Sequence, residues 1–263
     1  MATPAARTAL ITGASAGIGA AFAAEFASHG HNLVLVARRA DKLREIASQL
    51  ESEYKTVVTI LPLDLSDPEA GEQVSTFLEE ADISVDMLVN NAGYALNGGL
   101  LDVSWNEHQA MQQVMLTSYF ELCYRLLPGM VERGYGRIIN VSSLAAMMPA
   151  TPGNLYAAIK RYVNDMSLAI DYEFRDSGVQ CCAICPGFTY TEFHDVMGVR
   201  DRVSKMPKYL WQSAAEVAQE GYEAVMAGKL IVINGRVNRV WAWLMALLPR
   251  SLQYRGARAR RPA

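Results

Sequence analysis

Two side chains that can exchange protons, Tyr156 and Lys160, are spaced to lie on one face of a helix. A free tyrosine has a pKa of about 10, so at neutral pH it is a stable proton donor and a poor base, and a nearby ammonium group favours its phenolate. With 12 tyrosines and 6 lysines in the chain, roughly 0.3 such spacings are expected by chance. The surrounding sequence must therefore decide whether the pair has a function.

A glycine-rich turn lies between a predicted strand, Thr8–Thr12, and a predicted helix, Ile18–Ser28. Glycines permit a tight turn and let backbone N–H groups approach a pyrophosphate at the positive end of the helix. The order of strand, turn and helix favours a dinucleotide site over a purely structural turn. The turn residues that we expect to contact the nucleotide are Gly13, Ser15, Gly17, Ile18 and Gly19.

The residues that follow the second predicted strand, Asn32–Ala37, indicate which dinucleotide binds. A site for NAD usually has an acid here, which binds the ribose 2′-hydroxyl. Arg38 and Arg39 stand in its place, and guanidinium groups suit a 2′-phosphate by charge and by bidentate geometry. The sequence therefore predicts NADP(H), the alternative being that either arginine only solvates a loop.

Short β-branched runs alternate along the chain with amphipathic stretches of helical length. Asp67 followed by Pro68 is typical of an N-cap with proline at the first helical position, and Ser104 with Glu107 fits a capping box. Apolar strands separated by helices predict an α/β fold, a single-domain Rossmann-type doubly wound parallel sheet of about seven strands with helices on both faces. The other predicted elements are a helix over about 41–54 and strands at Thr56–Leu61, Met87–Asn90, Arg137–Val141, Val179–Ile184 and Leu230–Ile233.

The composition excludes several classes of protein. The chain has 263 residues, of which 51% are hydrophobic and 19% charged, which suits a packed core and not a disordered or fibrous chain. Its net charge of −3 gives no global field for nucleic acid. The chain has no apolar run of about 18 residues, so no membrane-spanning helix is predicted. The N-terminus does not resemble a signal peptide, and we therefore expect a cytoplasmic protein.

Three of the four cysteines, Cys181, Cys182 and Cys185, lie in one apolar run that is predicted as a strand. They are too close together to cross-link distant parts of a fold, which indicates a reducing compartment. Cys182 and Cys185 form a C-x-x-C, but no second Cys or His pair accompanies it to complete a zinc site. We expect buried cysteines that act as small hydrophobes, and no metal.

The order of the motifs resembles the short-chain dehydrogenase/reductase family over about residues 7–235. The resemblance implies that Tyr156 gives a proton to, or takes one from, the oxygen of a ketone or alcohol. It also implies that Lys160 binds the nicotinamide ribose and, with the nicotinamide charge, brings the tyrosine pKa nearer to neutral, and that Ser143 polarises the carbonyl. The motifs are the glycine turn, Asn90-Asn91-Ala92-Gly93, Ser143, Tyr156-x-x-x-Lys160 and Pro186-Gly187.

The same matching implies further contacts with the cofactor. Asp64 would contact adenine, with a simple strand-end cap as the alternative. The residues implied in cofactor binding beyond the glycine turn and the arginines are Asp64 and Leu65 at adenine, Asn91, Ala92 and Gly93, Tyr156 and Lys160, and Pro186, Gly187, Thr189 and Thr191 at the nicotinamide amide.

One position departs from the family pattern. Many members have an asparagine in the helix before the serine strand, where it helps to hold a proton-relay water. Met115 stands in the matching stretch here, and methionine cannot anchor a water. We expect a rerouted or weakened relay that uses Gln112 or Thr117, with catalysis retained.

Residues 188–212 correspond to a mobile lid over the substrate in the family. They are rich in aromatic and aliphatic side chains, which predicts a roomy, mostly apolar pocket for a bulky ketone or the corresponding secondary alcohol. His194 either contacts the substrate or is a surface or structural histidine. Met147 and Met148 either line the pocket or pack in the core. The residues predicted to line the pocket are Met147, Phe188, Phe193 and Met197.

Residues 236–263 extend beyond the predicted catalytic domain, 1–235. They resemble the tails of hydroxysteroid and long-chain ketoacyl reductases, but this resemblance is weaker than that of the core motifs to the family. An apolar stretch, 240–249, contains two tryptophans, and 250–263 holds five arginines and no acid. We expect a helix that closes the substrate pocket or a subunit interface. The alternative is an interfacial membrane helix, for which ten residues give a limited anchor.

The sequence thus predicts an NADP(H)-dependent oxidoreductase that interconverts a bulky apolar ketone and its secondary alcohol. The alternative is a non-catalytic NADP(H)-binding sensor or scaffold, which Met115 slightly favours. A nucleotide-sugar epimerase would need an added substrate domain, for which the chain is short. The resemblance also implies a homodimer or homotetramer.

Overall fold

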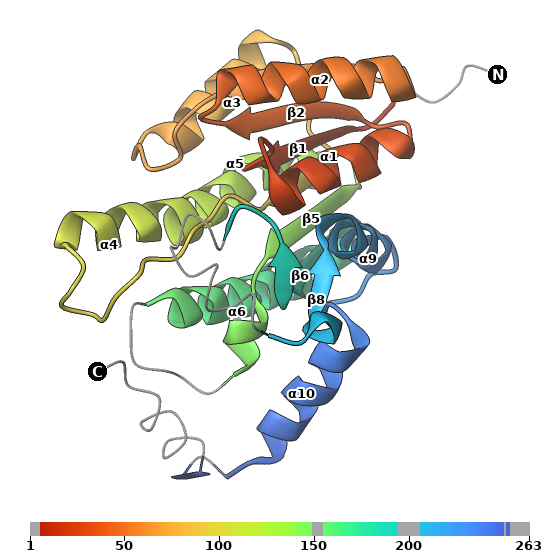
Figure 1. The fold of residues 1–263 in the computed structure, drawn as a ribbon. Coiled ribbons are helices and arrows are strands. Elements are labelled where there is room, and N and C mark those ends of the chain that lie inside the picture. Colours follow the sequence, from red (N-terminus) through yellow and green to blue (C-terminus); the bar gives the residue numbers. More distant parts are fainter. Residues whose placement is uncertain (1–5, 149–154, 194–205, 250, 253–263) are drawn as a thin grey trace.

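The computed structural model describes residues 6–148, 155–193, 206–249 and 251–252. In these residues the main sheet is parallel and seven-stranded, in the order β3-β2-β1-β4-β5-β6-β9 (Figure 1). The strand order reverses between β1 and β4, as in a doubly wound sheet, so the predicted fold class is confirmed. The strands are β1 (Thr8–Thr12), β2 (Asn32–Ala37), β3 (Val58–Pro62), β4 (Met87–Asn90), β5 (Gly136–Val141), β6 (Val179–Cys185) and β9 (Ile231–Ile233).

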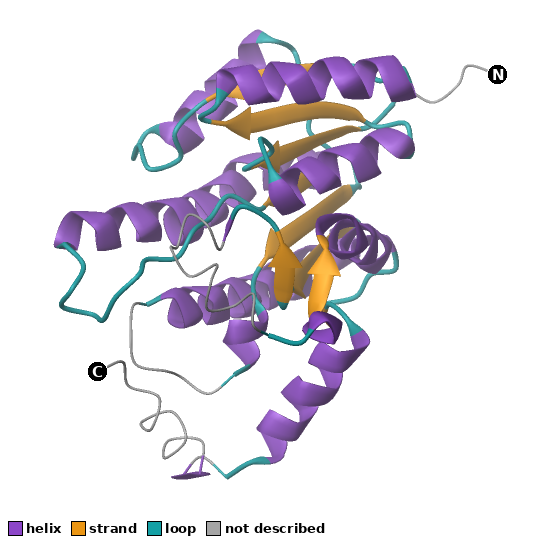
Figure 2. Cartoon of the chain, in the orientation of Figure 1, coloured by secondary structure: helices purple, strands orange, loops and turns teal. Residues whose placement is uncertain are grey.

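Helices cover both faces of this sheet (Figure 2). One face packs against α1 (Gly17–Ser28), α2 (Ala40–Tyr54) and α9 (Ala214–Met226). The other face packs against α3 (Ala70–Glu80), α4 (Trp105–Gln112), α5 (Ser118–Glu132) and α6 (Tyr156–Phe174). The layers follow from βαβ crossovers, which place helices on both sides of a parallel sheet.

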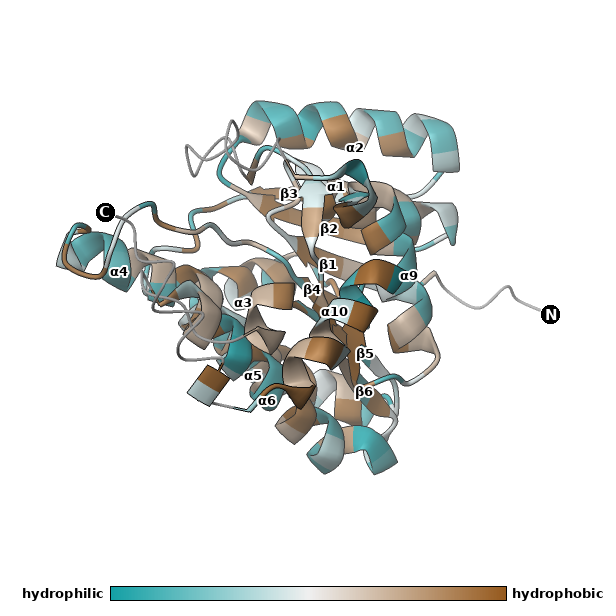
Figure 3. Ribbon diagram, turned by 60° about the horizontal axis from the view of Figure 1, so that its bottom comes forward, coloured by the Kyte–Doolittle hydropathy of each residue, from teal (hydrophilic) through white to brown (hydrophobic). Residues whose placement is uncertain are grey.

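Alternate residues of each strand enter two separate cores. In β2, Leu33 and Leu35 face the core of α1 and α9, whereas Val34 and Val36 face the core of α3 and α5. Side chains alternate along a strand, so a strand that is buried on both faces must be apolar throughout. This is why the strands form the brown centre of Figure 3, while the exposed helix α2 is largely teal.

The same alternation separates the C-x-x-C residues. Cys182 faces the core of α1 and α9, whereas the Sγ of Cys185 lies 3.5 Å from Oδ1 of Asn164 in α6, on the opposite face. All four cysteines are buried and free. In the described part of the chain, no three His, Cys, Asp or Glu side chains are grouped so as to hold a metal.

Two predicted starts were wrong by two residues, whereas the other predicted bounds lie within one residue of the observed ones. β3 begins at Val58 and not at Thr56, because Lys55 adopts a left-handed conformation and the backbone N–H of Val57 donates to the side chain of Asn32, 3.2 Å away. α3 begins at Ala70. Asp67 caps the preceding turn instead, since its Oδ1 accepts from the backbone N–H of Glu69 at 2.9 Å.

Capping boxes set the starts of α4 and α9. The predicted box of Ser104 and Glu107 is confirmed at α4, and Ser213 with Glu216 forms a second one at α9. Before α9, the short strands β7 (Phe188–Tyr190) and β8 (Trp211–Ser213) form a small parallel sheet.

The last described helix, α10 (Arg236–Leu247), follows β9 directly. No helix in the described ranges has the length and apolarity needed to cross a bilayer. The domain boundary at residue 235 stays a prediction.

Candidate active site

A cavity of about 1330 Å³ opens where β1, β4, β5 and β6 end. Its walls include Gly13 after β1, Asn91 after β4, Ser142 after β5 and Pro186 after β6. The carboxyl ends of parallel strands meet at one edge of a sheet, and ligands bind there at the point where the strand order reverses. The cavity therefore lies where a doubly wound sheet places its ligand.

The glycine turn is packed too closely to admit side chains. Gly13 and Gly17 adopt φ values of 66° and 56°, which other residues adopt only with strain. A Cβ atom on Gly19 would lie 2.3 Å from the carbonyl oxygen of Gly13. The turn thus brings the backbone of β1 and the first turn of α1 together, and a nucleotide can approach the N–H groups of α1 closely.

The segment after β4 is tied to this turn through Thr12. The Thr12 hydroxyl accepts from the backbone N–H groups of Asn91, at 2.9 Å, and Ala92, at 3.1 Å. In return, Nδ2 of Asn91 donates to the carbonyl oxygen of Thr12, at 2.9 Å. These bonds hold the Asn91-Ala92-Gly93 segment as one wall of the cavity.

The two arginines after β2 lie at one end of the cavity. Arg39 donates from Nε to the hydroxyl of Ser15, at 3.2 Å, and pairs with Glu192 at 3.0 Å. Arg38 lies 3.8 Å from Asp64, and its side chain is 75% exposed. Asp64 also accepts from the backbone N–H of Ser66, at 3.0 Å, so it caps a local turn as well.

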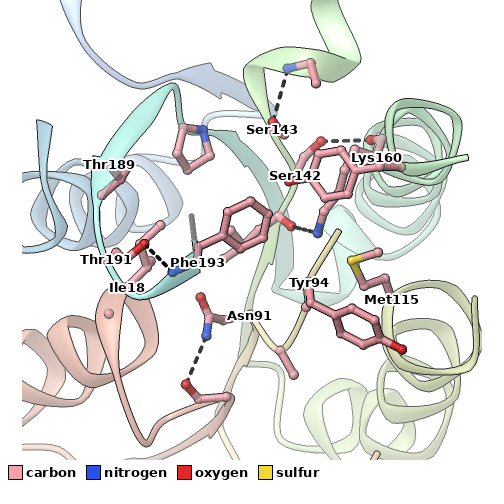
Figure 4. A pocket seen from close by; sticks show the side chains of 18 of the residues that line it. Ile18, Asn91, Tyr94, Met115, Ser142, Ser143, Lys160, Thr189, Thr191 and Phe193 are labelled. Atoms are coloured by element: carbon pink, nitrogen blue, oxygen red, sulfur yellow. Dashed lines mark hydrogen bonds between the residues drawn. The ribbon is translucent and has the colours of Figure 1, made fainter. Parts of the chain in front are cut away.

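Ser143, Tyr156 and Lys160 line the same cavity. The buried Lys160 donates from Nζ to the carbonyl oxygen of Val141, at 2.8 Å, and Nζ lies 5.8 Å from the centre of the Tyr156 ring (Figure 4). The hydroxyl of Ser142 donates to the carbonyl oxygen of Lys160, at 2.8 Å. These bonds join the end of β5 to the first turns of α6.

Burial shifts the pKa values of both Tyr156 and Lys160 in the protein without its cofactor. It raises the pKa of Tyr156 to about 12, against a smaller lowering by the hydrogen bond with Ser143. Burial also lowers the pKa of Lys160 to about 7. Loss of water disfavours the charged form of both groups. The protein's own groups therefore keep the phenol protonated.

Met115 fills the position of the expected asparagine. It is fully buried in a π-helical turn, Gln113–Thr117, and its Sδ lies 2.9 Å from where a Cβ on Gly93 would be. Gln112 donates to the carbonyl oxygen of His108 in its own helix, at 3.2 Å, and Thr117 is exposed. The predicted use of Gln112 or Thr117 as a substitute was wrong, since neither residue lines the cavity.

Most predicted site residues lie around this one cavity. Gly19 does not line the cavity, but its lack of a side chain allows it to pack closely against Gly13 in the turn. Of the two methionines expected at the pocket or in the core, Met148, which is extended, lines the cavity. Met147, which ends a 3-10 turn, does not, so its placement in the pocket was wrong. Met197 and His194 lie outside the described residues. The predicted residues that line the cavity are Gly13, Ser15, Gly17, Ile18, Arg38, Arg39, Asp64, Leu65, Asn91, Ala92, Gly93, Ser143, Tyr156, Lys160, Pro186, Gly187, Phe188, Thr189, Thr191 and Phe193.

The helix that was expected to close the substrate pocket or a subunit interface, α10, supplies part of the lining, but the sequence did not predict which of its residues do so. Asn238, Trp241 and Met245 all line the cavity. The close approach of α10 depends on Gly187, because a Cβ there would lie 2.4 Å from Nδ2 of Asn238. The spacing of these three residues on one helical face was the available signal.

The comparisons with known proteins agree with this geometry. The family described as short chain dehydrogenase matches residues 7–199. The chain belongs to this family. Its fold closely matches that of a short-chain dehydrogenase from Sphingobium yanoikuyae in complex with NADPH, with a TM-score of 0.82 and 29% identity, covering 98% of this chain and 96% of that one.

Two curated relatives show how far the similarity extends in this short-chain dehydrogenase. The NADP-dependent 3-hydroxy acid dehydrogenase YdfG of Escherichia coli is 30% identical over 256 residues, covering 96% of this chain and 98% of that protein. The human very-long-chain 3-oxoacyl-CoA reductase is 32% identical over 188 residues, covering 70% of this chain. That match spans only 60% of the human protein.

Proposed function

We propose that this short-chain dehydrogenase uses NADP(H) to interconvert a bulky apolar ketone and its secondary alcohol, with reduction as the favoured direction. The observation that carries the proposal is that Ser143, Tyr156 and Lys160 line the same cavity as the glycine turn and the two arginines. A dinucleotide in that cavity would reach from the arginines to the tyrosine. The family membership and the NADPH complex of the Sphingobium relative support the choice of cofactor.

The residues present fit a phosphorylated dinucleotide. Glycines keep the turn before α1 free of side chains where the pyrophosphate would approach. Arg38 and Arg39 carry the positive charge for the 2′-phosphate, and the strand end has no acid that would bind a 2′-hydroxyl. Asp64 and Leu65 lie beside them for the adenine. The cofactor is NADP(H), and when bound it supplies or accepts the hydride.

Tyr156 acts as the proton donor in the proposed reduction. The ketone oxygen becomes a hydroxyl, so it must gain a proton as the carbonyl carbon is reduced. A tyrosine with a pKa of about 12 is protonated at neutral pH, which supports donation and disfavours the reverse reaction. Ser143 donates a hydrogen bond to the same oxygen and polarises the carbonyl.

Lys160 positions the cofactor and adjusts the charge beside the tyrosine. Its Nζ donates one hydrogen bond to the Val141 carbonyl oxygen, and an ammonium group has further N–H donors for the hydroxyls of the nicotinamide ribose. With a pKa of about 7, it changes its charge near neutral pH. The charged form attracts a developing phenolate on Tyr156.

The substrate end of the cavity is largely apolar, which supports a bulky apolar ketone. Leu144, Met148 and Phe193 line it, as do Trp241 and Met245 of α10. Apolar walls with a few converging polar groups are typical of small-molecule sites.

The experiment that tests the function is NADPH oxidation with a panel of bulky, cyclic and acyl ketones, repeated with NADH. We expect turnover of bulky ketones with NADPH and much slower turnover with NADH. In Tyr156→Phe, turnover should be lost while NADPH binding is kept. NADPH binding without turnover of any ketone would instead favour the sensor or scaffold.

The outer face of α10 supports a contact with an anionic lipid surface. Val240, Trp243, Leu244 and Leu247 are exposed on one side of the helix. Arg236 begins the helix, and five arginines follow it in the sequence. Exposed tryptophan and leucine beside cationic residues suit the interface of an anionic membrane.

Vesicle flotation tests this contact. We expect the protein to float with anionic vesicles and not with neutral ones, and Trp243→Gln to reduce flotation. Leu101→Gln is the matched control, because Leu101 is 94% exposed and lies far from α10 in the sequence. Failure to float, or self-association that Trp243→Gln abolishes, would contradict the lipid contact. The homodimer or homotetramer stays a prediction, which light scattering tests.

A further inference from the structure

The segment 191–193, which follows β7, contacts three parts of the site. Thr191 packs against the glycine turn, since its Cγ2 lies 3.0 Å from where a Cβ on Gly17 would be. Glu192 pairs with Arg39. The centre of the Phe193 ring lies 6.0 Å from that of Tyr156, and Figure 4 shows Phe193 beside Thr191 in the cavity. Three consecutive residues thus connect the pyrophosphate turn, the arginine and the proposed proton donor.

The guanidinium group of Arg39 is already engaged in these contacts. Its Nε and one terminal nitrogen donate to the hydroxyl of Ser15, at 3.2 and 3.1 Å, and its other terminal nitrogen donates to Oε2 of Glu192, at 3.0 Å. The fork of N–H groups that suits a phosphate is therefore shared between the turn and a carboxylate. The Glu192 side chain is 59% exposed, so it can leave the pair for water.

A 2′-phosphate on Arg39 would meet this carboxylate. Two anions that bind one guanidinium group repel each other, and each weakens the binding of the other. Lys42 on α2 is another charged group near the pair. Its pKa is raised chiefly by a hydrogen bond to Glu45, and Arg39 and Glu192 act on it in opposite directions. Because Lys42 already pairs with Glu45 at 2.8 Å, Glu192 has Arg39 as its ion-pair partner.

We propose that Glu192 competes with the 2′-phosphate of NADP(H) for Arg39, so that binding of the phosphorylated cofactor breaks the Arg39–Glu192 ion pair. Glu192 then sets both the affinity for NADPH and its preference over NADH, which has no 2′-phosphate. The inference rests on the proposed role of Arg39 in cofactor binding. Because Phe193 is the next residue, release of Glu192 also frees the segment whose ring lies beside Tyr156.

The test is the dissociation constant of NADPH, measured by fluorescence with the full chain and without substrate. Glu192→Gln removes the charge and keeps the shape. We expect it to tighten NADPH binding about two- to fivefold, the range for loss of an exposed ion pair, and to leave NADH binding unchanged. Glu45→Gln is the matched control, since it removes one charge from the exposed pair with Lys42, outside the cavity.

A second variant tests whether the effect of Glu192→Gln on NADPH affinity depends on Arg39. In the Arg39→Gln background, Glu192→Gln should no longer change the affinity for NADPH. The proposal is overturned if Glu192→Gln leaves NADPH binding unchanged or weakens it, or if it tightens NADH binding equally. It is also overturned if Glu192→Gln changes the affinity for NADPH no more than Glu45→Gln does, or still changes it in the Arg39→Gln background. Binding is measured without turnover, so a failure of ketone reduction contradicts the proposed function and leaves this result interpretable.

Discussion

The ammonium group of Lys160 donates a hydrogen bond to the carbonyl oxygen of Val141, 2.8 Å away, inside the protein. Nζ also lies 5.1 Å from the centre of the buried Tyr119 ring. No carboxylate is within ion-pair distance of Lys160 in the described parts of the chain. Burial therefore lowers its pKa to about 7, and stability depends on the protonation of this lysine.

Lys160→Met should stabilise the protein most at and below neutral pH. An unfolded lysine keeps its proton up to a pH of about 10.4, whereas the folded one loses it near 7. Between these values the unfolded state binds more protons, so wild-type stability rises with pH. We expect the variant to lack this rise and to gain about a few kcal/mol at pH 6, less at pH 9. Urea unfolding at both pH values measures this, and parallel curves for the two proteins would contradict it.

Gly19→Ala should abolish tight NADPH binding. Its Cβ would lie 2.3 Å from a backbone oxygen of Gly13, so the turn itself must move. We expect about a tenfold or greater loss of affinity. Gly134→Ala is the control, because nothing lies within 4 Å of the Cβ position of Gly134, although its φ of 62° is positive and that of Gly19 is not. That variant should lose about 1 kcal/mol of stability and bind NADPH normally.

Met115→Asn should change the pH dependence of turnover and destabilise the fold. Met115 is fully buried and packs against Gly93. A buried amide without a hydrogen-bond partner would lower the stability of the fold by about 1–3 kcal/mol. An amide can, however, anchor a water beside Lys160, which a thioether cannot. Met115→Leu should keep the wild-type profile. If the asparagine variant also keeps it, the position is only packing.

Arg38→Gln should weaken NADPH binding about tenfold, because a charge-assisted hydrogen bond to a phosphate is lost. Binding of NADH, which has no 2′-phosphate, should change little. Arg44→Gln is the matched control, because Arg44 is an exposed α2 arginine that pairs with Asp41 at 2.6 Å outside the cavity. Titrations of both cofactors against the three proteins measure the difference. Equal losses for NADPH and NADH would show that Arg38 does not contact the 2′-phosphate.

Several elements were predictable because their signals are local. β1, β2 and β4 have the predicted bounds, since apolar runs between turn residues already define buried strands. The capping box of Ser104 and Glu107 involves residues three apart and needs no distant partner. The start of α3 was not predictable, because Asp67 can cap either a turn or a helix with the same side chain.

By itself, the amino-acid sequence determined the parallel sheet and the glycine turn, because these depend on periodicity and on short spacings. The Ser143, Tyr156 and Lys160 set followed from the order of the motifs, which resembles that of the family. Only the tertiary structure decided that α10 lines the cavity and that Arg39 meets Glu192, 153 residues away. It also decided the pKa shifts of Tyr156 and Lys160, which arise from burial. Burial and long-range contacts depend on how the whole chain packs, and no local pattern specifies them.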